Sequence, residues 1–188
     1  MSVASIDHTG PWTVADVLAL PEDRRYRYEL YGESLIMSPA PGVRHQRASH
    51  RLHVAIDAAA EAAGVSVEVL EAVNVITPSG LFVPDLVVVD AGATADDPVS
   101  IDAEAVLLAV ELVSPGNAPM DRKLKPLAYA EAHIPHFWRV EFDPSPRIVM
   151  GMLDRGRYVE QADAIAGAVT TVDEPFPFAI DPAQLARR

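Results

Sequence analysis

Cysteine is absent from this 188-residue sequence and lysine is scarce, with two lysines against 13 arginines. A chain without cysteine has no disulfide framework, no thiolate metal site and no cysteine nucleophile. No apolar run reaches the roughly 18 residues that a membrane-spanning helix needs. The first 12 residues lack the basic segment and apolar stretch of a signal peptide, so we expect a cytoplasmic protein.

Positive charge is also scarce, because 27 acidic residues face 15 basic ones and leave a net charge of −12. This balance argues against a protein that coats nucleic acid, but it permits an enzyme with local basic contacts. The composition, 49% hydrophobic and 22% charged, is that of an ordinary globular protein. We therefore predict a flexible lead-in over residues 1–12 and a single domain over residues 13–188.

The spacing of apolar residues and turn signals predicts an α/β fold, with a mixed β-sheet flanked by α-helices. Thr13 and Asp16 resemble a capping box that opens the first helix. Residues 91–104 are expected to form a polar, acidic loop. The expected helices cover about 13–20, 44–63, 120–133 and 182–186, and the expected strands cover 27–30, 33–38, 65–70, 73–76, 84–90, 105–113, 137–142, 147–153 and 158–161.

The most informative residue is Glu111, the one charged residue in the apolar segment 105–113. A continuous apolar pattern of this kind predicts a strand that is covered on both faces. An unpaired carboxylate buried there would cost several kcal/mol, so Glu111 needs a base, a metal ion or a proton. A structural salt bridge, for example to Lys125, explains the residue as well as a functional site does.

Asp85 is the second candidate carboxylate, because it opens another apolar strand directly after Pro84. The alternative is a simple strand-start aspartate, which is common. Two carboxylates that enter one sheet on neighbouring strands suit a hard divalent ion such as Mg²⁺. Glu29, in the first predicted hairpin, either pairs with an arginine or adds a further carboxylate to the metal.

Lys125 follows Glu111 by 14 residues, on a predicted helix where Asp121 and Tyr129 share its face. An isolated lysine usually lies in solvent. The use of lysine in a chain that otherwise relies on arginine favours a role that needs a compact ammonium group over a solvated lysine beside Lys123. Pro126 follows directly, so the helix either bends there or begins near Lys125 with the proline in its first turn.

The basic residues concentrate over residues 24–53, where Arg44, Arg47 and Arg51 form one stripe of a predicted helix. Such a stripe can follow a phosphate backbone, although a solvated helix face is the commoner explanation. His45 begins this helix directly after a loop and is a further candidate for a nucleic-acid contact. The sequence has no phosphate-binding glycine loop and gives little support for a histidine-rich zinc site or a serine nucleophile.

Several short motifs occur along the chain in a distinctive order and spacing. In that order they resemble the Uma-two-like family of putative restriction endonucleases, bacterial proteins of the PD-(D/E)XK nuclease superfamily. The resemblance covers about residues 14–185. The matching segments are Arg27 to Leu30, Met37 to Pro39, Arg44 to Gln46, Pro84 to Val89, Val110 to Pro115, Asp121, Lys125 to Tyr129, Ile134 with Pro135, and Phe137 with Trp138.

This resemblance implies a restriction-endonuclease-like core and Mg²⁺- or Mn²⁺-dependent hydrolysis of DNA phosphodiester bonds. It identifies Asp85 and Glu111 as the metal-binding acidic pair and Lys125 as the catalytic lysine. Val113 stands where the superfamily usually has lysine. The resemblance therefore places the catalytic lysine on the following helix, at Lys125. Glu29 matches an early acid of the family. A homodimer is expected, since many such nucleases cut two strands with two subunits, and DNA binding by the isolated chain is expected to be weak.

Two other functions stay open at this point. The chain could be a catalytically inactive, nuclease-like binding or regulatory module, or a metal-dependent phosphoesterase that acts on a nucleotide. A third explanation makes Glu111 and Lys125 a purely structural ion pair, so that Glu111→Gln lowers stability. A metal site predicts the reverse, because removing one of several clustered carboxylates stabilises the protein when no metal is bound.

Overall fold

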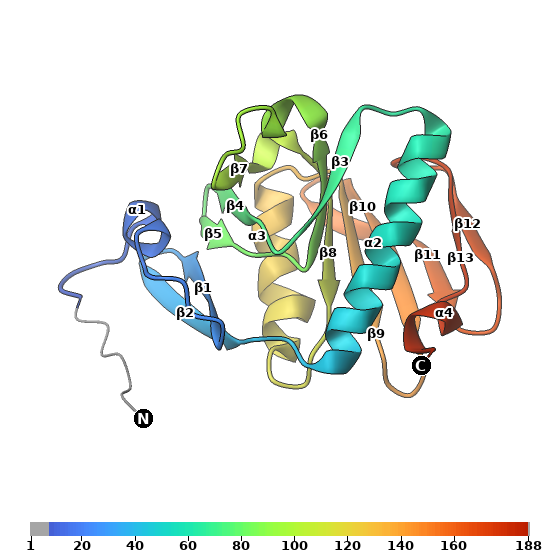
Figure 1. Cartoon of the computed structure of the whole chain (residues 1–188), viewed down its shortest axis with the longest axis horizontal. Coiled ribbons are helices and arrows are strands. Elements are labelled where there is room, and N and C mark those ends of the chain that lie inside the picture. Colours follow the sequence, from blue (N-terminus) through green and yellow to red (C-terminus); the bar gives the residue numbers. More distant parts are fainter. Residues whose placement is uncertain (1–7, 188) are drawn as a thin grey trace.

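The computed structural model describes residues 8–187, and a six-stranded mixed sheet forms their centre (Figure 1). Neighbouring strands of this sheet are antiparallel except β8 and β9, which run parallel. In spatial order the strands are β11 (Arg157–Ile165), β10 (Arg147–Asp154), β9 (His136–Glu141), β8 (Val106–Leu112), β6 (Leu86–Asp90) and β3 (Val67–Glu71).

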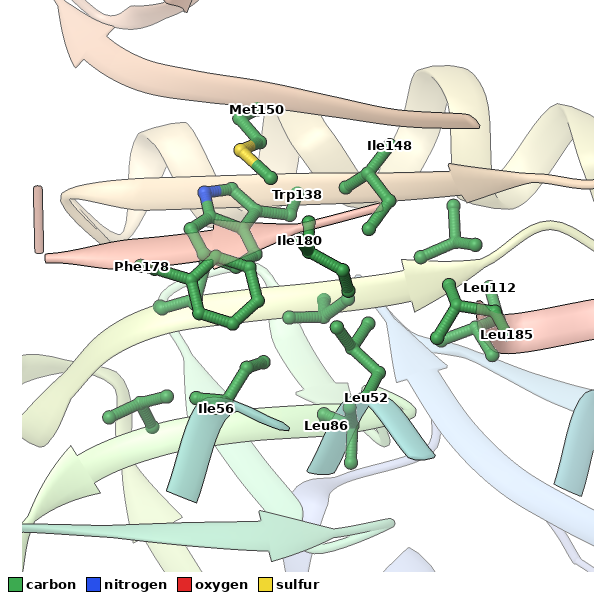
Figure 2. Packing of buried hydrophobic residues seen from close by; sticks show 14 of the residues in the cluster. Leu52, Ile56, Leu86, Leu112, Trp138, Ile148, Met150, Phe178, Ile180 and Leu185 are labelled. Carbon is green, nitrogen blue, oxygen red and sulfur yellow. The ribbon is translucent and has the colours of Figure 1, made fainter. Parts of the chain in front are cut away.

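Two helices cover the opposite faces of this sheet. On one face α2 (Val43–Ala63) packs Leu52 into a core that also contains the indole of Trp138 (Figure 2). On the other face α3 (Lys125–Glu131) packs Tyr129 against the sheet. Because both faces are covered, the central strands β6 and β8 are apolar along almost their whole length.

A second, five-stranded sheet packs against the α3 side and contributes Val75 and Phe82 to the core there. Its strands are β2 (Ser34–Pro39), β1 (Tyr26–Tyr31), β5 (Gly80–Phe82), β4 (Asn74–Thr77) and β7 (Ser100–Asp102). The remaining elements are the pair β12 (Thr170–Val172) and β13 (Phe178–Ile180), and the short helices α1 (Val14–Leu18) and α4 (Ala183–Ala186).

The predicted α/β class with helices flanking mixed sheets is confirmed, as are most of the predicted elements. The capping box of α1 forms, with Thr13 and Asp16 bonded to each other's backbone N–H groups. The loop predicted over 91–104 is wrong in part, because β7 and two 3₁₀ turns lie there. Strands β5, β12 and β13 were not predicted; each has three residues, too few to display a periodic pattern.

The predicted flexible lead-in falls mainly on residues 1–7, which lie outside the described residues. The following segment makes contacts with the fold: Trp12 donates its backbone N–H to Glu33 and packs near Leu30. Among the described helices, even the 21-residue α2 lacks the apolar length needed to cross a membrane.

Gly80 sits where β5 passes against β1, with φ +145°. A Cβ on this residue would lie 2.1 Å from the carbonyl oxygen of Leu30. We expect Gly80→Ala to lower the free energy of unfolding by about 3 kcal/mol, because one backbone must move away from the other. Gly116→Ala is the matched control, since nothing lies within 4 Å of its added Cβ. Urea unfolding compares the two variants, and equal midpoints would contradict the expectation.

Candidate active site

Four side chains singled out from the sequence meet in one pocket of about 220 Å³. Glu29 comes from β1, Asp85 immediately precedes β6, Glu111 lies on β8, and Lys125 begins α3. None of the four is more than 4% exposed. The rest of the lining includes Arg27, His45 and Asp121 as well as residues of the loop between β2 and α2 and of the loop after β8. The fold therefore brings together four candidate residues that are up to 96 positions apart.

Glu111 points toward α3, because side chains of a strand alternate and its neighbour Ala109 lies on that face. Its carboxylate accepts hydrogen bonds from the Tyr129 hydroxyl at 2.7 Å and from Lys125 Nζ at 3.1 Å. Lys125 and Tyr129 are four residues apart on a helix, so both reach the same carboxylate. The ion pair considered as the structural explanation of Glu111 is therefore present, and it lines the pocket.

Lys125 bridges two carboxylates, since its Nζ lies 2.9 Å from Glu29 Oε1 and 3.1 Å from the carboxylate of Glu111. The backbone N–H of Val83 also donates to Glu29 Oε1, at 2.8 Å, and fixes its position. Burial alone lowers the pKa of Lys125, but the charges of Glu111 and Glu29 outweigh this effect and raise it. The lysine is therefore held as an ammonium ion.

Pro126 lies near the start of the helix that carries Lys125. A π-helical turn, Met120–Leu124, leads into α3, and Pro126 falls in the first turn of that helix. Pro126 therefore lies in the first turn of α3, as in the second of the two predicted arrangements, where proline is tolerated. The helical conformation nevertheless begins before Lys125, because the π-helical turn precedes α3 without a break.

Asp85 is held by three donors. Arg27 Nη1 lies 2.6 Å from Oδ1, while His45 Nε2 at 2.9 Å and the Leu112 backbone N–H at 2.8 Å contact Oδ2. Burial raises the pKa of Asp85, but the hydrogen bond with His45 and the positive charge of Arg27 outweigh it and lower the pKa to about 2. Asp85 is therefore ionised at neutral pH.

The pocket holds more negative than positive charge. Burial, with a contribution from neighbouring carboxylates, raises the pKa of Glu111 well above its usual value and that of Asp121 to about 6. When all four acids are ionised, they exceed the two permanent cations by two negative charges, which is the charge of one divalent cation. The four carboxylates and two permanent cations of the lining are Glu29, Asp85, Glu111, Asp121, Arg27 and Lys125.

These residues fit a divalent cation in donor type and in charge, because carboxylate oxygens are the ligands that Mg²⁺ prefers. Within residues 8–187, no three Asp, Glu or His side chains form a ready-made cage for an ion. The oxygens of Asp85 and Glu111 are bonded instead to Arg27, His45 and Lys125. A cation that takes these two carboxylates as ligands has to compete with the chain's own donors.

The helix stripe proposed to contact nucleic acid is divided by the fold. His45 turns inward to Asp85, and Arg51 donates to backbone carbonyl oxygens near the C-terminus. Arg44 is exposed and lies 3.8 Å from an aspartate in the loop after β9. Arg47 is half-buried and makes no ion pair with the described residues. Arg44 and Arg47 are the two members of the stripe left to contact a ligand.

Two residues of the site were not singled out as functional from the sequence. The sequence places Arg27 in the basic segment and in a motif of the family resemblance without a role of its own, although its position two residues before Glu29 on a strand puts both on one face. Asp121 likewise belongs to the resemblance and shares a helix face with Lys125, but no role is predicted for it. The i, i+2 and i, i+4 spacings were the signals that could have identified them.

Comparisons with known proteins agree with this fold. The Uma2 family model, described as "Putative restriction endonuclease", matches residues 14–184. A solved structure titled "a putative nuclease belonging to DUF820 from Anabaena variabilis" is similar, with a TM-score of 0.74 and 14% sequence identity. The match covers 93% of this chain and 97% of that one, and it confirms the fold. No curated protein matches the sequence.

Proposed function

Because the chain belongs to the Uma2 family, we propose that it is a metal-dependent endonuclease that hydrolyses DNA phosphodiester bonds. One observation carries the proposal: four carboxylates and a lysine are buried together around one pocket. Burying so many charges is costly for stability, and such clusters with shifted pKa values concentrate at functional sites. A phosphate diester is a substrate that suits a lysine beside a carboxylate-bound cation.

In this mechanism Asp85 and Glu111 would hold Mg²⁺ or Mn²⁺. Bound there, the cation would supply a water of lowered pKa and offset negative charge on the phosphate. Lys125 orients the attacking water or donates to the charge that develops on the phosphate. Glu29 positions Lys125 through the 2.9 Å contact and would add a further carboxylate to the metal-binding group. The Tyr129 hydroxyl holds Glu111 in place.

DNA binding by the isolated chain is expected to be weak, because the protein carries a net charge of −12. Arg44 and Arg47 are the proposed contacts to the phosphate backbone, at the start of the helix that borders the pocket. A cytoplasmic homodimer, in which each subunit cuts one strand, stays part of the proposal.

Cleavage of supercoiled plasmid and of single-stranded DNA tests this function. We expect cleavage with Mg²⁺ or Mn²⁺ and none with EDTA, and protein carrying Asp85→Asn, prepared identically, excludes a contaminating nuclease. Cleavage that persists in EDTA would contradict the metal dependence. A folded protein that binds these metals but leaves both DNA substrates intact would contradict the endonuclease function.

A nucleotide phosphoesterase is the second candidate, and the small pocket favours it, since about 220 Å³ accommodates a mononucleotide fragment better than a duplex. The same assay with a nucleoside monophosphate and a dinucleotide as substrates separates the two functions. Release of inorganic phosphate without cleavage of DNA would favour the phosphoesterase.

A further inference from the structure

Asp85 is bonded to one fixed donor and two donors that can leave. The Leu112 N–H belongs to the interior of the sheet, so its 2.8 Å bond keeps Oδ2 in place. Arg27 and His45 are side chains, bonded at 2.6 Å and 2.9 Å. The other ring nitrogen of His45, Nδ1, is buried and has no hydrogen-bond partner among the described residues. Asp85 can therefore change partners without losing its position.

Of the two permanent cations of the pocket, Arg27 is held less firmly. The Lys125 side chain is 5% exposed and bonded to two carboxylates. The Arg27 side chain is 24% exposed and makes one ion pair with the described residues. A cation that binds Asp85 through Oδ1 competes directly with Arg27 for this oxygen. The Arg27 guanidinium is already partly exposed, so water solvates it when it leaves Asp85, and this solvation offsets part of the lost ion pair.

We propose that Arg27 is an exchangeable latch on Asp85: it bonds Oδ1 until a divalent cation takes that oxygen, and its freed guanidinium then binds a phosphate oxygen of the substrate. A guanidinium suits both partners, because its fork of N–H donors matches carboxylate and phosphate oxygens alike. Arg27 lines the pocket that holds Asp85 and Lys125, so its new partner lies in the same site. This inference rests on the proposed function and adds to it a substrate-binding residue.

The latch predicts opposite effects of one substitution on two ligands. We expect Arg27→Met to bind Mn²⁺ about tenfold more tightly, because the cation no longer displaces a charged hydrogen bond. We expect the same variant to bind DNA about tenfold more weakly than the wild-type protein does, when both are measured with Ca²⁺ in place of Mg²⁺. The salt dependence of its DNA affinity should correspond to about one phosphate contact fewer. If Arg27 only stabilised the local structure, Arg27→Met would bind both Mn²⁺ and DNA more weakly than the wild type.

Calorimetric titration with Mn²⁺, in the absence of DNA, measures the first effect. Titrations at 0.5 M KCl separate direct displacement from long-range attraction, which screening suppresses beyond a few ångströms. Arg122→Met is the matched control: it removes another paired arginine, bonded to Glu141, outside the pocket lining. Arg27→Gln provides a second test variant, and thermal unfolding confirms that each protein is folded.

A second readout follows the latch directly. Nitrogen NMR signals of the Arg27 side chain, assigned by their loss in Arg27→Gln, are expected to shift when Mg²⁺ is added to the wild-type protein. Wild-type protein that binds Mn²⁺ no more weakly than Arg27→Met and Arg27→Gln would overturn the latch and leave the endonuclease proposal intact. If the variants bind Mn²⁺ more tightly but bind DNA as well as the wild type does, the second part of the proposal, in which Arg27 binds a phosphate oxygen, would be overturned. Wild-type protein that binds no divalent metal would overturn both the latch and the proposed function.

Discussion

Lys125→Met is expected to lower the free energy of unfolding by about 3–5 kcal/mol in buffer containing EDTA, because it leaves two buried carboxylates without their cation. Glu29 and Glu111 lie 2.9 Å and 3.1 Å from the ammonium nitrogen, and both side chains are almost fully buried. Methionine fills a similar volume, so the loss reports the missing charge rather than a cavity.

The other lysine of the chain is the matched control. Lys123 lies two residues earlier, is exposed, and makes no ion pair with the described residues. Lys123→Met is therefore expected to change stability by no more than about 0.5 kcal/mol. Urea unfolding of both variants measures the difference. A loss below about 1 kcal/mol in Lys125→Met would show that the buried carboxylates do not depend on this lysine.

Glu111→Gln is expected to behave in the opposite way and to match or exceed the wild-type stability in EDTA. Burial raises the pKa of Glu111, so folding opposes its ionisation, and the wild type loses stability as pH rises from the usual carboxyl range toward the raised pKa. Glutamine carries no charge to bury and still accepts a hydrogen bond from Tyr129, while Lys125 keeps Glu29 as a partner. A loss of 2 kcal/mol or more, on the order of a broken buried pair, would instead identify Glu111 and Lys125 as a structural pair.

Asp85→Asn is expected to reduce metal-dependent DNA cleavage by more than about 100-fold, because even the outer partners of metal ligands contribute 10- to 100-fold. Asparagine has nearly the same shape and retains an oxygen for the Leu112 N–H, but its amide nitrogen replaces the oxygen that accepts from Arg27, so the variant also loses the Arg27 ion pair. The variant loses the charge that would hold the cation, and we expect its Mn²⁺ affinity to fall together with the cleavage rate.

Asp57→Asn is the control for this experiment, since it removes one negative charge from the exposed face of α2. Plasmid cleavage rates of both variants are measured over a range of Mg²⁺ concentrations, and circular dichroism verifies that each is folded. Cleavage by Asp85→Asn within tenfold of the wild type at saturating Mg²⁺ would rule out Asp85 as an essential ligand.

Local features of the chain were predictable because their causes lie within a few residues. The capping box of Thr13 and Asp16 involves neighbours in sequence. The helix expected over 44–63 is present as Val43–Ala63, where Gly64 adopts the left-handed conformation that ends it. The three-residue strands were missed, because pairing with distant partners, not their own pattern, makes them strands.

The sequence by itself determined the α/β class, the family resemblance and the identity of the candidate carboxylates and lysine, because an acid in an apolar strand and one of only two lysines are visible without coordinates. Only the tertiary structure decided which charges meet. It paired Lys125 with Glu29 as well as Glu111, and it turned His45 and Arg27 onto Asp85. The contacts of Lys125 with Glu29, and of Asp85 with His45 and Arg27, join residues 40 to 96 positions apart. They depend on how two sheets and two helices pack, which no local pattern in the chain encodes.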